Sequence, residues 1–595
     1  MNEPWIGGMG ATPYPGGCAF RVWAPHADSV SVVGDFNGWY PDANHLTHEG
    51  NGYWYATVEG AHAGQQYKFR IHTGWRQLDK VDPYAARVTH SAGNGIIYNH
   101  GDFDWQGDDF RLANHNDLII YEAHVGTLMT RWGGGPGGFE QVIHKLGHLN
   151  HLGVNALQLM PVMEFPGDYS WGYNPSHMFA VKSTYGGPDM LKLLVREAHR
   201  YGIAIIMDVV YNHFGPTDLD LWQFDGWSID DRGGIYFYPD ERAWTPWGNT
   251  RPDFGRDEVR RFIHDNAMMW LYDYHVDGLR YDMTPYIRSI GAGTDNDIPE
   301  GWEMIRRINL DIRNSYPGRI TIAEDLLGDS RITGEEDESA AFHSQWDANF
   351  VHTVRAALTA YDDRDRSVAE VVGAISDKLD NDVFSRVIYT ENHDEVSNGH
   401  ARLVSEISPH DHHGWHALKR STLGAALVFT SPGIPMIFQG QEFAQDGWFG
   451  DDRPIDWWLN EVNHGIVNLY RDLIALRLDA RGGTAGLKGQ GLRIIHASEE
   501  SKVIAFQRFE HHGVGDDVVV VVNLSGENRM GYTIGMPAPG LWSLRFNSDS
   551  RMYSPLFSEQ GSGDVVATPG DYDGMDAKAT LGVGGYSVLV YAYHG

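Results

Sequence analysis

The sequence predicts an α/β protein built around a (β/α)8 TIM barrel, with an all-β domain on each side of it. Two observations predict this architecture. From about residue 115 to about residue 440, short apolar runs alternate with helical patterns, and eight such β–α units can be found. The first hundred residues and roughly the last hundred instead carry short alternating runs separated by glycine-rich turns.

The N-terminal domain, residues 1–105, is expected to be a small β-sandwich. Its strands are predicted from short runs in which apolar and polar residues alternate, with glycine and asparagine between them. The runs are Ala19–Val22, Val30–Val33, Tyr53–Val58 and Tyr67–Ile71.

The barrel is expected to span residues 106–483. Seven of its strands are predicted from apolar runs that are typical of buried parallel strands, and a weaker eighth is predicted at Phe342–Phe350. The seven runs are Leu118–Val125, Ala156–Val162, Ile203–Val210, Gly278–Asp282, Arg319–Asp325, Ser385–Asp394 and Ile434–Gln439. A doubly wound sheet is the alternative, but no glycine-rich phosphate loop follows the first strand.

Helices and one long loop complete the predicted barrel. Pro188 opens a helix whose apolar residues Leu191, Leu194, Val195 and Ala198 have helical spacing. Residues 211–257 carry little periodicity and follow the third strand, and loops that long in a barrel are usually functional.

The C-terminal domain, residues 484–595, is expected to be a second β-sandwich. A helix predicted at Asn460–Leu478 precedes it, and Val518–Val522 and Tyr586–Tyr593 are predicted as two of its strands.

Composition narrows the classes of function. The net charge of −33 would repel a phosphate polymer, so nucleic acid is not an expected partner. No run of about twenty apolar residues predicts a membrane span, and the N-terminus lacks the pattern of a signal peptide. The single cysteine, Cys18, allows no internal disulfide and no thiolate metal cluster, which fits a cytoplasmic protein.

Four predicted strands end in acidic residues. They are Asp208, Asp282, Glu324 and Asp394, and chemistry in a barrel takes place at the C-terminal ends of its strands. Gathering several carboxylates costs repulsion and desolvation, and a functional site is a common reason for it. A hard cation also collects carboxylates, but Arg280 lies two residues before Asp282 and argues against a dication there.

Glycoside hydrolysis requires such a pair of carboxylates. In the retaining mechanism one attacks the anomeric carbon and forms a covalent glycosyl intermediate, while the other, protonated, donates to the leaving oxygen. Arg280 is expected to keep Asp282 ionised, whereas Glu324 must hold a proton near neutral pH.

The four strand ends resemble, in order, the sequence regions of glycoside hydrolase family 13, the α-amylase superfamily. The segment Gly34–Trp39 resembles the β-sandwich found in branching enzymes and trehalohydrolases, which is classed with glycogen-binding modules such as carbohydrate-binding module 48. The C-terminal β-domain resembles that family's domain C.

The resemblance implies roles for individual residues. Asp282 corresponds to the nucleophile, Glu324 to the general acid/base and Asp394 to the transition-state stabiliser. The other substrate-binding positions are expected to be these. Arg280 corresponds to the arginine that orients the nucleophile, His213 and His393 to the histidines that bind sugar hydroxyls, and Tyr121 to the aromatic residue that stacks on the sugar. Asp208 matches a further position of the family and is expected to be mainly structural. Trp171 and Tyr173 lie in a loop that is expected to reach the cleft. Asn212 matches a calcium-binding position of many α-amylases, but its partners are not identifiable, and we expect neither a metal nor another cofactor.

Within the family, the sequence resembles two groups of enzymes with different activities. Glu391–Val396 and Met436–Phe443 resemble branching enzymes, which transfer the glucan to a 6-hydroxyl. Tyr185–Pro188 and Val209–Pro216 instead resemble maltooligosyltrehalose trehalohydrolases. The branching activity is favoured. An α-amylase-type hydrolase and, more remotely, a non-catalytic glucan-binding protein are also compatible with the sequence. The expected partner is an α-1,4-glucan such as amylose, glycogen or a maltooligosaccharide, and the expected state is a monomer or small homo-oligomer.

Overall fold

The computed structural model describes residues 7–595 apart from 42, 113, 335–337 and 380–381. Its contacts divide the chain into two compact units. The first unit comprises Met1–Arg111, His124–His144 and Leu159–Glu324, and the second comprises Leu112–Ala123, Lys145–Gln158 and Asp325–Gly595. In the described part of the chain, none of the helices combines the length and the hydropathy needed to span a lipid bilayer.

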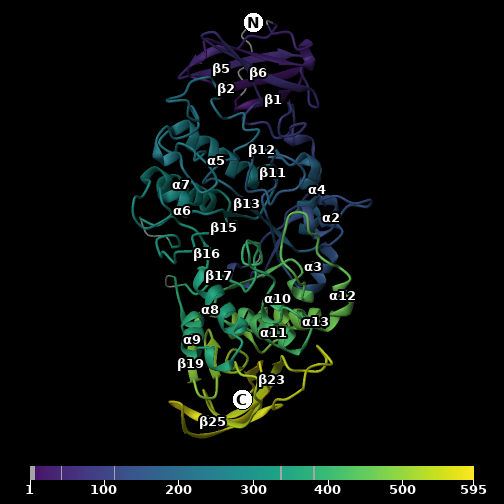
Figure 1. The fold of residues 1–595 in the computed structure, drawn as a ribbon, viewed down its shortest axis with the longest axis vertical. Coiled ribbons are helices and arrows are strands. Elements are labelled where there is room, and N and C mark those ends of the chain that lie inside the picture. Colours follow the sequence, from purple (N-terminus) through teal and green to yellow (C-terminus); the bar gives the residue numbers. More distant parts are fainter. Residues whose placement is uncertain (1–6, 42, 113, 335–337, 380–381) are drawn as a thin grey trace. The chain divides into compact units, whose positions relative to one another are not determined.

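The N-terminal residues form the predicted sandwich of two antiparallel sheets (Figure 1). One sheet has the order β1 (Gly10–Tyr14), β2 (Gly17–Trp23), β5 (Tyr53–Glu59), β4 (Thr47–Gly50). The other runs β3 (Ser29–Gly34), β6 (Gln66–Thr73), β7 (Arg76–Lys80), and β8 (Gly95–Ile96) pairs with β6. Phe20 of one sheet packs against Tyr67 and Phe69 of the other, with ring centroids 5.3 and 6.5 Å away. These aromatic contacts form the centre of the sandwich.

The barrel is closed by eight strands, and each predicted run supplies one of them. In chain order they are β9 (Ile120–Ala123), β10 (Ala156–Leu159), β13 (Ala204–Val209), β14 (Gly278–Tyr281), β15 (Ile320–Ala323), β16 (Ser344–Trp346), β17 (Arg386–Ile388) and β18 (Ile434–Phe438). Every residue of these strands is buried, which explains why their sequences are continuous apolar runs rather than alternating ones. The weak prediction at residues 342–350 is confirmed as β16.

Helices follow the strands in both units. In the first unit they are α1 (Val125–Leu128), α2 (Phe139–Ile143), α4 (Gly187–Arg200), α5 (Asp257–Tyr272), α6 (Pro285–Arg288) and α7 (Pro299–Ser315). In the second unit they are α3 (Leu146–Leu152), α8 (Ala348–Thr359), α9 (Val368–Ser376), α10 (Leu403–Ile407), α11 (Trp415–Thr430), α12 (Leu459–Val462) and α13 (His464–Arg477). The helix predicted from Pro188 is α4, and its four spaced apolar residues are all buried.

A small hairpin between β10 and α4 was not predicted. It consists of β11 (Met163–Glu164) and β12 (His177–Val181), which are antiparallel. The buried Lys182 ammonium joins it to the loop between the two strands, donating to the Glu164 carboxylate at 2.9 Å and to the Phe165 and Gly167 carbonyls. A two-residue strand is too short to show a period, so only this tertiary pairing defines it.

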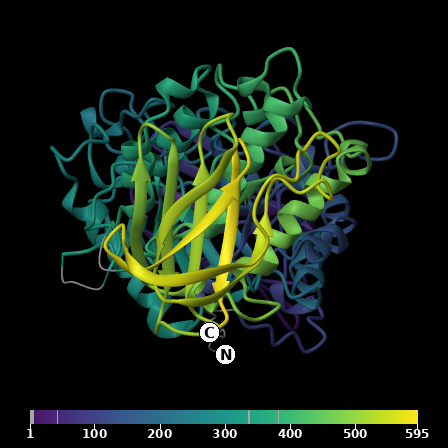
Figure 2. The same ribbon diagram turned by 90° about the horizontal axis from the view of Figure 1, so that it is seen from below.

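The C-terminal strands lie on one continuous hydrogen-bonded path in the second unit (Figure 2). Its order is β19 (Gly491–Ser498), β20 (Val503–Phe509), β21 (Val518–Asn523), β26 (Ser587–Tyr593), β23 (Gly540–Asn547), β24 (Val565–Tyr572), β25 (Met575–Val583), β22 (Arg529–Met536). His496 of β19 lies 2.7 Å from the Tyr532 hydroxyl of β22, so the two ends of the path meet. The sheet therefore curls over its own core, in which Trp542 is fully buried.

One buried histidine fastens the linker after the sandwich to the barrel strands of the first unit. Both ring nitrogens of His199, near the end of α4, face carboxylates: Asp108 at 2.8 Å and Asp277 at 2.9 Å. Asp277 also accepts from the Ile205 backbone and pairs with Arg319. Burial alone would lower the pKa of His199, but the hydrogen bonds and charges of the two aspartates outweigh it and raise that pKa. A ring that donates from both nitrogens is an imidazolium.

We expect this contact to make stability depend on pH. Because the folded-state pKa of His199 is raised, its contribution is fully present below the unfolded value of about 6.5 and is lost as pH rises through the folded value. Hydrogen bonds to charged groups contribute roughly 1.5–3 kcal/mol. His199→Gln should therefore lower the free energy of unfolding by about 2 kcal/mol at pH 6, and the deficit should shrink toward pH 9. Urea unfolding of both proteins across this range measures it, and a pH-independent deficit would contradict the assignment.

Candidate active site

The register of the strands brings the predicted acids of the first unit to the same height along the barrel. Asp208 pairs with Arg280 and Val209 with Tyr281 between β13 and β14, and Tyr281 in turn pairs with Ala323 of β15. Asp282 and Glu324 each follow the last residue of their strand. Their backbone N–H groups continue the ladder, Asp282 to the Val209 carbonyl at 2.9 Å and Glu324 to the Tyr281 carbonyl at 3.0 Å.

Arg280 is the common partner of all three acids. Its Nη1 lies 2.6 Å from Asp208 Oδ2 and 3.4 Å from Asp282 Oδ1, and its Nη2 lies 2.6 Å from Glu324 Oε2. The guanidinium has no exposed surface. Burial would lower its pKa, but the nearby charges of Asp208 and Glu324 raise it well above the usual value. Arg280 is therefore a permanent cation between the predicted nucleophile and the predicted acid/base.

The backbone next to Asp282 also reaches Glu324. Met283 has a φ of +37°, which non-glycine residues rarely adopt, and its N–H donates to Glu324 Oε2 at 2.9 Å. Such strain is found where a structure needs a group in one place. Since Oε2 accepts from both Arg280 and Met283, a proton on Glu324 belongs on the other oxygen, Oε1.

Asn212 and His213 support Asp282 from the loop that follows β13. Asn212 Nδ2 donates to the backbone carbonyl of Asp282 at 2.8 Å and to its Oδ2 at 2.6 Å. The Asn212 side-chain oxygen faces Nδ1 of His213. His213 Nε2 faces the Tyr173 carbonyl, its ring stacks on Trp247 at 4.7 Å, and burial lowers its pKa to about 4. The ring of His213 thus fixes the orientation of the Asn212 amide.

These contacts decide whether the Asn212 side chain could bind calcium. Both ends of its side-chain amide are engaged, one by Asp282 and the other by His213, so the residues do not fit a cation held by the amide oxygen. Within the described residues, no three histidine, cysteine or acidic side chains are grouped as metal ligands. The expectation that the protein needs no metal remains a prediction.

The loop holding Trp171 and Tyr173 reaches the same cluster. The Tyr173 hydroxyl donates to Asp208 Oδ2 at 2.8 Å, and Arg280 Nη1 lies 3.3 Å from that hydroxyl. Gly172 between the two aromatics has a φ of +96°, and a Cβ there would lie 2.3 Å from the Pro161 carbonyl oxygen. Glycine is therefore required at this turn, which leaves both Trp171 and Tyr173 partly exposed.

The second unit holds the other predicted residues. His393, which follows β17, donates its backbone N–H to Glu122 at 3.0 Å, and its Nδ1 lies 2.8 Å from the same carboxylate. Its Nε2 lies 3.4 Å from Asp394. The Asp394 side chain is 46% exposed, so this carboxylate is open to a ligand. Glu122 was not predicted, although an acid inside an otherwise apolar strand was a signal for it.

Tyr121 is placed differently from its predicted role. It has no exposed surface, and its hydroxyl donates to Glu442 at 3.1 Å while accepting from the Gly440 N–H at the same distance. Stacking on a sugar requires an open ring face, which Tyr121 does not offer in this structure. Glu442, held also by His148 at 2.9 Å, is a second buried acid that the strand-end argument did not include.

Three family profiles match the chain. Carbohydrate-binding module 48 (isoamylase N-terminal domain) matches residues 8–85, the α-amylase catalytic domain matches residues 84–221 and 222–461, and the α-amylase C-terminal all-β domain matches residues 494–594.

Individual proteins agree with these profiles. The chain is 33% identical to a 1,4-alpha-glucan branching enzyme GlgB of Corynebacterium jeikeium, over 96% of this chain and 81% of the relative. It is 30% identical to that of Corynebacterium diphtheriae, over 97% and 80%. A pullulanase type I from Bacillus subtilis, solved with maltose, superposes with a TM-score of 0.77 at 21% identity, over 100% of this chain and 86% of that one, and shows the fold alone.

The catalytic-domain profile covers more than half of the chain, and the strand-end acids lie within it. The chain therefore belongs to the α-amylase family, glycoside hydrolase family 13.

Proposed function

We propose that this protein is a retaining 1,4-α-glucan branching enzyme. The proposal rests mainly on the contacts of Arg280, whose buried guanidinium holds the carboxylates of Asp282 and Glu324 on its two terminal nitrogens. A retaining glycosidase needs two carboxyl groups about 5–5.5 Å apart in unlike environments. Asp282 and Glu324 are neighbours, and apart from Arg280 their hydrogen-bond partners differ. The relatives named branching enzymes support the choice of acceptor.

In the first step, an oxygen of Asp282 attacks the anomeric carbon of an α-1,4-linked glucose. The bond from that carbon to O4 of the next glucose breaks, and Glu324 gives its proton to O4. The shortened glucan leaves with a free 4-hydroxyl, and the rest of the chain remains bound to Asp282 as an ester.

In the second step, a 6-hydroxyl of another glucan replaces water as the acceptor. Glu324, now ionised, takes the 6-hydroxyl proton while that oxygen attacks the anomeric carbon, and Asp282 departs as the carboxylate. Two displacements restore the α configuration and form an α-1,6 branch. Both carboxyl groups return to their starting protonation states, so no cofactor is needed.

The remaining residues have proposed roles in sugar binding. Asp394 and His393 are proposed to bind sugar hydroxyls, since the Asp394 carboxylate is open to a ligand. Tyr173 is proposed as the aromatic platform in place of Tyr121, because it is partly exposed beside Asp208 and Arg280. The proposed substrates are amylose, glycogen and longer maltooligosaccharides. A cytoplasmic setting belongs to the same proposal, supported by a single, buried Cys18.

Removing the nucleophile should abolish activity. Asp282→Ala leaves no group to form the ester, so we expect kcat on amylose to fall by at least about a thousandfold. The loss of iodine staining over time measures it. Tyr201→Ala, an exposed residue just after α4, is the matched control and should retain full activity. Unchanged activity in Asp282→Ala would overturn the mechanism.

The products identify the acceptor. With amylose as substrate, we expect iodine staining to fall while reducing ends stay nearly constant, and a debranching isoamylase should then release short chains. Reducing ends that rise in step with lost staining would instead identify an α-amylase-type hydrolase. Release of trehalose from maltooligosyltrehalose would identify a trehalohydrolase.

Asn212 should position the nucleophile without touching the sugar. Asn212→Ala removes a hydrogen bond that favours the ionised form of the Asp282 carboxylate. We expect kcat to fall about 10- to 100-fold with little change in KM, and the acid limb of the kcat/KM profile to move to higher pH. Activity measured from pH 5 to 8 tests this, and a lower kcat with an unmoved acid limb would contradict the positioning role.

A further inference from the structure

One buried carboxylate of the second unit faces the ring of His393. Glu122 is the third residue of β9 and has no exposed surface. Its carboxylate accepts from the His393 backbone N–H at 3.0 Å and lies 2.8 Å from Nδ1 of the same residue. The backbone of β9 pairs with β18, and the Glu122 carbonyl accepts from the Gln439 N–H. Strand pairing therefore accounts for the position of β9, but not for an acid within it.

An acid in this position costs stability unless its charge is compensated. Burying a carboxylate without partners is expensive, because the group loses its contact with water. Among the residues that the structure describes, His393 supplies the one basic side chain within ion-pair distance of Glu122, and neither a lysine nor an arginine lies as near. A role at His393 is therefore the simplest reason for this acid.

The carboxylate also decides which ring nitrogen carries a hydrogen. An ionised carboxylate only accepts hydrogen bonds, so Nδ1 of His393 must be an N–H nitrogen. Because one carboxylate holds both the backbone and the ring edge of His393, the rotation of the ring is fixed. Nε2 then lies 3.4 Å from Oδ2 of Asp394, whose side chain is 46% exposed. Nε2 is thus directed toward an open carboxylate rather than into the core.

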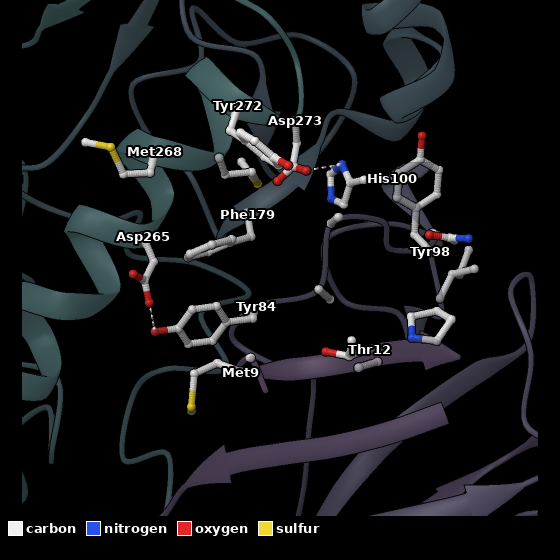
Figure 3. A pocket seen from close by; sticks show the side chains of 18 of the residues that line it. Met9, Thr12, Tyr84, Tyr98, His100, Phe179, Asp265, Met268, Tyr272 and Asp273 are labelled. Carbon is white, nitrogen blue, oxygen red and sulfur yellow. Dashed lines mark hydrogen bonds and ion pairs between the residues drawn. The ribbon is translucent and has the colours of Figure 1, made fainter. Parts of the chain in front are cut away.

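Another buried histidine shows that an acid nearby is not sufficient for this effect. A pocket of about 560 Å³ in the first unit, between the N-terminal sandwich and helix α5, is lined by His100 and Asp273 (Figure 3). Nδ1 of His100 lies 3.9 Å from the Asp273 carboxylate, which is too far for a hydrogen bond. Burial lowers the pKa of His100 to about 3, so this ring carries no charge at neutral pH. Asp273 therefore fixes no hydrogen on its histidine, whereas Glu122 does.

We propose that Glu122 is a positioning residue for sugar binding. It holds His393 with a hydrogen on Nδ1, so that Nε2 meets a hydroxyl of the sugar beside Asp394. The inference rests on the proposed function for the role of His393. Glu122 is buried and touches no sugar, so it acts only through the ring. A group held by supporting hydrogen bonds keeps the geometry that the reaction needs.

Glu122→Gln changes the hydrogen bonds but keeps the size of the side chain. Its single oxygen can accept from the His393 backbone N–H, and its NH2 group then faces Nδ1 and can only donate to it, which moves the ring hydrogen to Nε2. We expect kcat/KM on amylose to fall about 10- to 100-fold in a protein whose circular dichroism is unchanged. Glu122→Asp, which retains a carboxylate, should regain part of the loss. Unchanged kcat/KM in Glu122→Gln would overturn the proposal.

A double-mutant cycle separates positioning from support of the fold. If Glu122 acts only through His393, Glu122→Gln should change kcat/KM by less than about twofold once His393 is replaced by alanine. Glu122→Gln effects of equal size with and without His393→Ala would indicate a structural role and contradict the proposal.

Glu442→Gln is the matched control for this cycle. Glu442 is as deeply buried in the same unit, but it contacts Tyr121 and His148 rather than His393. The effect of Glu442→Gln on kcat/KM, whatever its size, should be the same in both backgrounds. If both acids were coupled to His393, the coupling would not be specific to Glu122, and the proposal would fail.

The two proposals can fail separately, because binding gives a readout without turnover. In the Asp282→Ala protein, Glu122→Gln should weaken the binding of maltoheptaose, measured by calorimetry, and should have no further effect beside His393→Ala. If this coupling is found but the active protein forms no branches, the proposed function fails and the role of Glu122 stands. If branches form and the two substitutions are additive in binding and in kcat/KM, the role of Glu122 alone is refuted.

Discussion

The chemistry of this protein depends on one buried cation. Arg280 compensates three carboxylates that would otherwise repel one another in a space closed to water. The attraction is strong because these groups are buried, and for the same reason the loss of Arg280 would leave uncompensated charges at a cost of about 3–5 kcal/mol. The strands β13, β14 and β15 must keep their register, because a shift by one residue would turn Arg280 or its partners to the other face.

Around this cation, the surrounding groups have distinct tasks. Asn212 donates to Asp282, the ring of His213 fixes Asn212, and the strained backbone of Met283 donates to Glu324. The site therefore orients its carboxylates with hydrogen bonds as well as with the positive charge of Arg280.

The N-terminal sandwich is joined to the long insertion after β13 by polar contacts. Lys80 donates to the carbonyls of Asp220 and Trp222 in the long insertion, and the Val81 N–H donates to the Asp220 carboxylate. The His199 contact holds the linker that follows. The sandwich is thus fixed to the insertion after β13.

The sequence by itself determined the architecture and the identity of the principal acids. Asp208 lies near the end of its strand, and Asp282 and Glu324 directly follow theirs, so the apolar runs alone predicted that these acids lie at one end of the barrel. Tertiary structure alone decided which side chains meet. Three features arise from residues that lie far apart in the chain: the burial of Tyr121, the engagement of Asn212 by Asp282, and the supporting acids Glu122 and Glu442. Local periodicity carries no information about such pairs, because it records which face a residue presents and not what lies opposite.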